Sequence, residues 1–77
     1  MHIKVYPNPA SDNIIIDYNF SGEILFYDVY GRTNVFNIEG LSGQKIIDIR
    51  EWNEGLYYYT IIVNNNSIVR NKVLIIR

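Results

Sequence analysis

Few side chains in this chain could take part in catalysis, and they do not form a catalytic pattern. His2 is the single histidine, and it stands at the start of the sequence, where chains usually fray. A triad in which histidine activates a serine would depend on His2 alone, because the chain has no second histidine and no cysteine. We therefore expect no enzyme, no catalytic residue and no cofactor.

The acidic residues do not form a metal-binding pattern either. Asp12, Asp17, Asp28 and Asp48 fall in separate turns and strands. Calcium needs about six to eight oxygens that converge on one point, and no loop here has the acidic, glycine-centred spacing that supplies them. We predict no metal site.

Tyr57-Tyr58-Tyr59 raises the hypothesis of a binding surface. Side chains alternate along a strand, so Tyr57 and Tyr59 would face the core while Tyr58 points outward. Tyr58, together with Tyr27 or Tyr30, would then form an exposed aromatic strip. Such a strip predicts, as one alternative, an accessory β-sandwich module that binds carbohydrate or a neighbouring protein domain.

The cations do not support nucleic-acid binding, because they are not clustered with stacking aromatic residues. They are Arg32, Arg50, Arg70, Lys72 and Arg77. We expect Arg70, Lys72 and Arg77 to face solvent, where they would also protect a strand edge from pairing with another chain.

The length of 77 residues predicts one domain covering 1–77, and the hydrophobic fraction of 48% is enough for a core. The net charge of −1 provides no long-range attraction to nucleic acid or to a membrane surface. No apolar run approaches the roughly 18 residues of a membrane span, so we expect no membrane insertion. Met1–Lys4 lacks the apolar region of a signal peptide, so if the domain is exported, its signal peptide lies elsewhere on a longer chain.

Alternating apolar residues and regular turn signals predict seven short strands, with Trp52 closing one end of the core. Ile14, Ile16 and Tyr18 would share one face of their strand, and the residues expected to point inward include Ile24, Phe26, Ile47 and Ile49. The strands are Ile3–Tyr6 at an edge, Asn13–Tyr18, Glu23–Val29, Arg32–Glu39, Gln44–Ile49, Gly55–Val63 as a central strand buried on both faces, and Ile68–Ile76 after a turn at Asn64–Ser67. This pattern is typical of an all-β fold, a small immunoglobulin-like antiparallel β-sandwich.

Two local signals are specific. Pro7 and Pro9 lack an N–H and restrict the residues before them to extended conformations, which predicts a stiff, extended lead-in followed by a turn at Ala10-Ser11-Asp12. Asp28-Val29-Tyr30-Gly31 has the residues of a type I turn, in which Gly31 can take a positive φ and close a bulged hairpin.

In combination, these pieces resemble the type A C-terminal sorting domain of the type IX secretion system (the Por secretion system) of Bacteroidota. The resemblance runs from Val5 to the last residue. The matching segments are Tyr6–Ala10 with the strand Ile14–Ile16, Ile24–Arg32 with its Asp-x-x-Gly-Arg ending, Ile47–Ile49 followed by Gly55-Leu56-Tyr57, and Lys72–Ile75. The chain departs from the family at Asn53-Glu54, where a small residue or proline is frequent, and in the strongly apolar Leu74–Ile76.

The resemblance implies a sorting signal that is itself a substrate. The cargo would lie N-terminal to the domain in the same chain and cross the inner membrane with a separate signal peptide. The type IX translocon would then recognise the folded domain in the periplasm and move the cargo across the outer membrane. A surface sortase would remove the domain, leaving the cargo secreted or on the cell surface.

We expect three segments to carry recognition: the lead-in with Pro7, Asn8 and Pro9, the hairpin with Asp28, Gly31 and Arg32, and the last strand with Lys72 and Arg77. Gly55, Tyr57 and Trp52 would be a structural motif. Another interpretation stays open, in which Pro7, Gly31 and Gly55 matter only for folding.

Overall fold

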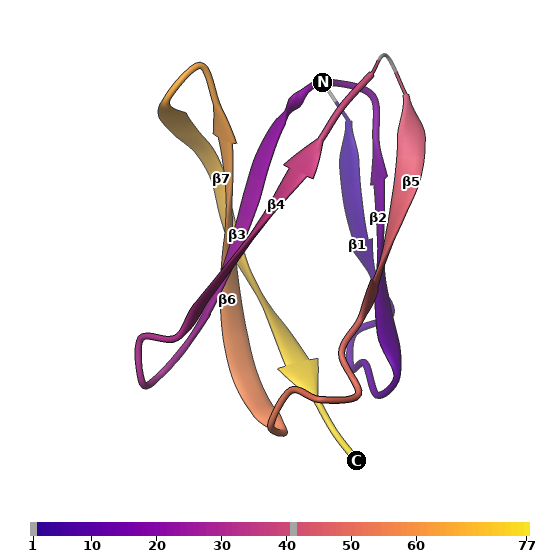
Figure 1. The fold of residues 1–77 in the computed structure, drawn as a ribbon, viewed down its shortest axis with the longest axis vertical. Helices are drawn as coiled ribbons and strands as arrows, with labels where there is room; N and C mark the ends of the chain where they lie inside the picture. The colour runs from indigo at the N-terminus through magenta and orange to yellow at the C-terminus, as the bar shows by residue number, and fades with distance from the viewer. Residues whose placement is uncertain (1, 41) are drawn as a thin grey trace.

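The computed structural model describes residues 2–40 and 42–77, and it consists of two antiparallel sheets that face each other (Figure 1). The three-stranded sheet has the order β1 (Ile3–Tyr6), β2 (Asn13–Tyr18), β5 (Gly43–Asp48). The four-stranded sheet has the order β4 (Thr33–Ile38), β3 (Gly22–Asp28), β6 (Gly55–Val63), β7 (Asn66–Ile75). The predicted seven-stranded β-sandwich is confirmed.

The position of β4 distinguishes this sandwich from a constant-type immunoglobulin domain. In a constant-type immunoglobulin domain the fourth strand lies beside the fifth. In this chain β4 pairs with β3, at the edge of the four-stranded sheet. β4 and β5 therefore lie on one open side of the sandwich, and β1 and β7 lie on the other (Figure 1). Within residues 2–40 and 42–77 there is no helix long and apolar enough to cross a membrane.

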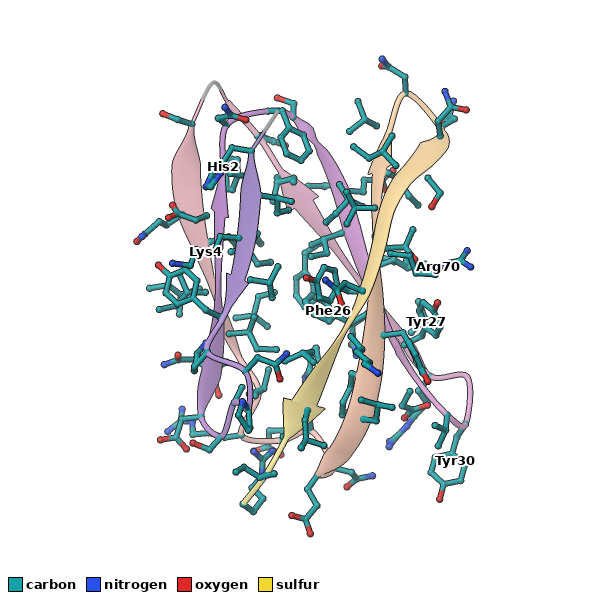
Figure 2. All side chains as sticks on the ribbon, turned by 180° about the vertical axis from the view of Figure 1, so that it is seen from behind. His2, Lys4, Phe26, Tyr27, Tyr30 and Arg70 are labelled. Carbon is teal, nitrogen blue, oxygen red and sulfur yellow. The ribbon has the colours of Figure 1, made fainter. Side chains whose placement is uncertain are left out.

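The core forms where the inward side chains of the two sheets meet. Ile24, Phe26, Ile47 and Ile49 are buried as predicted, and Phe26 lies between the sheets (Figure 2). Of the three residues predicted to share a face, Ile14 and Ile16 are buried and Tyr18 is half-buried. The ring of Phe26 contacts Trp52 and Tyr59, each with its centroid 5.6 Å away. Trp52 also packs against Tyr57 at 5.2 Å, at the end of the core next to the β5–β6 crossover. Alternation along each strand thus accounts for the main core contacts.

β6 is central in its sheet, as predicted, but it is not buried on both faces. Tyr57 and Tyr59 face the core, whereas Tyr58 and Leu56 on the outer face are only half-buried. A two-layer sandwich provides no third layer to cover that face, so neighbouring side chains are its only cover. Tyr27 from β3 supplies part of it by stacking on Tyr58, with centroids 5.7 Å apart.

The turn between β6 and β7 is shorter than predicted. Asn64 and Asn65 both have positive φ, 53° and 64°, and β7 already begins at Asn66. Two consecutive positive φ values suit the right-handed twist of a hairpin, and asparagine tolerates them well. A register shift at Ile61/Ile62 lets the longer β7 continue along β6. The other predicted strand boundaries agree with the structure to within one residue.

Candidate functional site

The segment around Asn8 lies against the edge of β7, which the sequence analysis did not foresee. The Asn8 Nδ2 donates to the Lys72 carbonyl at 3.2 Å, and its Oδ1 accepts from the Leu74 N–H at 3.1 Å. Both Tyr6–Pro7 and Asn8–Pro9 peptide bonds are cis. The chain bends at Asn8 and Pro9, so the predicted stiff lead-in is not extended throughout.

Ala10 continues this contact, so the predicted turn does not begin there. Its N–H donates to the Leu74 carbonyl at 2.8 Å, and its carbonyl accepts from the Ile76 N–H at 2.9 Å. Ala10 thereby forms a parallel bridge with Ile75 and is fully buried. The segment can pair with β7 because the carboxamide of Asn8 supplies a donor and an acceptor, as a peptide group does. Pro7 and Pro9 on either side have no N–H to donate.

Asn8→Ala should destabilise the domain by about 1–2 kcal/mol, because it removes two hydrogen bonds worth roughly 0.5–1.5 kcal/mol each. Urea unfolding monitored by tryptophan fluorescence would measure the loss. Asn37→Ala is the matched control, because the structure shows no side-chain hydrogen bond from this exposed residue, and its effect should stay within about 0.5 kcal/mol. Equal losses in the two variants would contradict the assigned role of Asn8.

The β3–β4 hairpin is organised by the carboxylate of Asp28. Its Oδ1 accepts from the backbone N–H groups of Tyr30 at 2.9 Å and Arg32 at 3.0 Å, and its Oδ2 accepts from the Arg32 Nε at 3.1 Å. Gly31 has a φ of 87°, and its N–H donates to the Asp28 carbonyl at 3.1 Å. The predicted turn closed by a glycine with positive φ is confirmed.

Two aspartates have pKa values below the usual 3.8. Burial alone would raise the pKa of Asp28, but the hydrogen bonds from Arg32 and Tyr30 outweigh it and the net pKa is lowered. The Arg50 side chain and N–H, through hydrogen bonds to the carboxylate, lower the pKa of Asp48 to about 2. Asp48 and Arg50 also form an ion pair at 2.7 Å. Both carboxylates are thus held in their charged form by the fold.

The domain should lose stability in acid, between about pH 4 and about pH 2. A carboxylate whose pKa is lower in the folded than in the unfolded state stabilises the fold at pH values above the unfolded-state pKa. That contribution is lost as the pH falls through the folded pKa, which for Asp48 is about 2. Asp48→Asn should show a smaller fall in melting temperature over this range. If the melting temperature of Asp48→Asn falls as much in acid as that of the parent protein, Asp48 is not a source of the acid sensitivity.

Four of the residues singled out in the sequence line one hollow at the end of the sandwich: Asp28, Arg32, Trp52 and Tyr57. The Tyr57 hydroxyl donates to the Asn53 carbonyl at 2.7 Å, and burial together with the charge of Asp28 raises its pKa. The Arg32 side chain is 63% exposed and contacts Asp28 only through Nε. The free end of its guanidinium can therefore bind a carboxylate of a partner in a bidentate geometry.

The buried polar side chains of this hollow are engaged within the fold. Within the described ranges, no group of three or more His, Cys, Asp or Glu residues is placed to hold a metal ion. The buried groups of the hollow are already hydrogen-bonded: Asp28 to Arg32 and Tyr57 to Asn53. The arrangement is suited to docking against another protein surface.

Comparison with known families gives a match over nearly the whole chain. The sequence pattern of the secretion system C-terminal sorting domain matches residues 4–77. The chain belongs to this family. No curated protein and no solved structure matches it. The sorting domain is the C-terminal sorting signal for type IX secretion, which takes its cargo through the periplasm to the cell surface or the extracellular space.

The segments expected to carry recognition gather at one end of the sorting domain. Figure 1 places the lead-in after β1, the tip of the β3–β4 hairpin, the β5–β6 crossover and the end of β7 at the same end. His2 lies at the opposite end (Figure 2). Gly55, with a φ of 141°, is the first residue of β6, and it does not line the hollow formed by Asp28, Arg32, Trp52 and Tyr57.

Arg77 of the sorting domain is exposed, as expected, but its guanidinium is also bound to the fold. Its guanidinium donates to the carbonyls of Ile49 at 2.6 Å and Arg50 at 3.4 Å, and to those of Ser11 and Trp52. These contacts tie the end of the chain to the lead-in and to the crossover. No local pattern could have indicated them, because they join residues 25–66 positions apart. Arg70 and Lys72 are exposed, as expected.

Of the two predicted pairings of Tyr58, the structure shows the one with Tyr27, although the pair is not fully exposed. Tyr58 stacks on Tyr27, and both are half-buried. Tyr30 is 86% exposed and lies apart from them at the hairpin tip (Figure 2). The hypothesis of a carbohydrate-binding module gains no specific support from this arrangement.

Proposed function

We propose that the type IX machinery reads this domain in its folded form, at the end of the sandwich that carries the lead-in, the hairpin tip and the end of β7. The residues that would carry recognition are Pro7, Asn8, Pro9, Asp28, Gly31, Arg32, Lys72 and Arg77. In this proposal the domain is a substrate of the translocon and has no catalytic role.

The contact between Asn8 and β7 is the observation that supports this proposal best. The hydrogen bonds join Asn8 to Lys72 and Leu74, which lie 64 and 66 residues away. Two of the three expected recognition segments therefore share a surface only when the chain is folded. An unfolded chain would present them as separate peptides with no fixed spacing.

Charge and rigidity favour docking at this end. Arg32 presents the free part of its guanidinium, and Lys72 adds an exposed cation on β7. Both suit a partner surface that carries carboxylates. The surface is held by hydrogen bonds within the domain, so docking orders few additional groups and loses less entropy.

The opposite end provides a place for the cargo. A cargo that precedes His2 in the chain would join the domain at the end away from the hollow (Figure 2). The recognition end would then stay accessible while the cargo is attached. After outer-membrane passage, a surface sortase would cut the chain ahead of the domain and so release the cargo or link it to surface lipopolysaccharide.

Export of a fluorescent cargo fused to surface variants tests the proposal. We expect Arg32→Gln combined with Lys72→Gln to reduce export at least about tenfold, a factor that corresponds to one lost charged contact of about 1.4 kcal/mol. Lys45→Gln, on the other sheet, is the matched control and should export normally. Melting temperatures of the isolated variants must match the parent protein. Unchanged export by the folded double variant would show that this end is not read.

A further inference from the structure

The four edge strands of the sandwich differ in how they are protected against pairing with another chain. Natural edges carry charges, prolines or bulges, or they are covered. β1 contains Lys4 and is followed by Pro7, β5 contains Lys45, and β7 contains Arg70 and is covered near its end by the lead-in. β4, with the sequence TNVFNI, has no charge, no proline and no glycine. Its pairing with β3 is continuous, without a bulge.

The free edge of β4 presents backbone groups of alternate residues. The Asp28 N–H donates to the Arg32 carbonyl at 3.1 Å, which marks this pair as hydrogen-bonded. Because hydrogen-bonded and non-hydrogen-bonded pairs alternate in an antiparallel ladder, every second residue of β4 directs its N–H and C=O away from β3. These residues are Thr33, Val35 and Asn37. In the described part of the chain, no other strand pairs with this edge.

We propose that β4 pairs with β4 of a second copy of this chain, antiparallel and about a two-fold axis that passes Val35. Each Val35 then lies opposite its own counterpart, and Thr33 of each copy lies opposite Asn37 of the other. The two four-stranded sheets become one sheet of eight strands. A two-fold contact requires a self-complementary surface, and this register places no like charges opposite each other.

The charges beside β4 also favour a second copy as the occupant. Arg32 precedes the strand and Glu39 follows it, so the two ends carry opposite charges. The two-fold axis brings Arg32 of one copy and Glu39 of the other to the same end of the joint. The Arg32 guanidinium retains unused N–H groups there, because only Nε contacts Asp28.

Val35 supplies the apolar contact of the joint. Its side chain is 53% exposed on the outer face, and pairing would cover it with the same residue of the second copy. One six-residue strand from each copy buries a small area, so the association should be weak and depend on concentration.

A charge-swap experiment at Val35 tests both the surface and the register. Analytical ultracentrifugation of the parent domain from about 10 µM to about 1 mM should show a reversible monomer–dimer equilibrium, the range in which weak complexes form. Val35→Lys and Val35→Glu, each alone, should weaken association at least about tenfold, because like charges then lie directly opposite. An equimolar mixture of the two variants should restore association, because opposite charges then meet. Ile46→Lys, at a residue 66% exposed on the other sheet, is the control and should associate like the parent.

Three results would overturn the proposal. The first is a parent domain that stays monomeric over the whole range. The second is a Val35→Lys variant that associates as well as the parent, which would place the contact elsewhere. The third is a mixture that associates no better than either variant alone, which would rule out the Val35-to-Val35 register. Melting temperatures of the monomeric variants verify that all of them are folded.

Discussion

Phe26→Ala is expected to cause the largest loss of stability of any substitution considered for this domain, about 3–5 kcal/mol. Phe26 is fully buried and contacts Trp52, Tyr59 and Phe36. Truncating a buried phenylalanine costs about 3–5 kcal/mol, because the neighbours cannot fill the cavity. A domain of 77 residues has a total stability of only about 4–12 kcal/mol. Urea unfolding and circular dichroism would measure the effect.

Ile46→Ala provides the matched control for Phe26→Ala. Ile46 is also a large apolar residue in a strand, but 66% of it is exposed, so its truncation should cost less than about 0.5 kcal/mol. If the machinery reads a folded signal, Phe26→Ala should also abolish export of a fused cargo while Ile46→Ala does not. An unfolding free energy of Phe26→Ala within about 1 kcal/mol of the parent value would contradict the described core.

Gly22→Ala should be the most damaging of the small substitutions, at about 1–3 kcal/mol, the range typical of overpacking. A Cβ at Gly22 would lie 2.5 Å from the carbonyl oxygen of Ile62, which belongs to the neighbouring strand β6. Backbone in the middle of a sheet cannot move away without separating β3 from β6. The unfolding free energy of the variant measures the cost.

Gly43→Ala is the control for Gly22→Ala, because Gly43 also starts a strand. There the nearest atom to a new Cβ is the Tyr18 hydroxyl at 3.1 Å, the far end of a side chain that can shift. The shift would weaken only the hydrogen bond from that hydroxyl to the Glu39 carbonyl, so we expect a loss below about 1.5 kcal/mol. A loss for Gly22→Ala no greater than for Gly43→Ala would contradict the close β3–β6 contact.

The strands and the hairpin could be predicted because their determinants are local. Alternation along Asn13–Tyr18, and the apolar, aromatic and β-branched run of Gly55–Val63, predicted both strands at the boundaries that the structure shows. Asp28 and Gly31 lie three residues apart, and their turn chemistry needs no distant partner. The ordered set of family motifs then indicated the sorting function, which the family match confirms.

The features that the sequence did not predict depend on residues far apart in the chain. The carboxamide of Asn8 and β7 are brought together only by the folded chain, and the same holds for Arg77 and the carbonyls that surround it. Neither contact leaves a periodic or motif-like signal. The burial of β6 was overestimated for a different reason: apolar residues on its outer face, such as Tyr58, are covered by a neighbouring ring and not by a third layer.

Export of a fusion protein tests the central claim, that this folded domain is a sufficient sorting signal. Residues 1–77 would be joined to the C-terminus of a fluorescent protein carrying its own signal peptide, in a host with an intact type IX system and in its translocon-deficient twin. We expect fluorescence at the surface or in the medium of the intact strain only, with a fall in mass where a sortase removes the domain. Retention of the folded fusion in the periplasm of both strains would contradict the account.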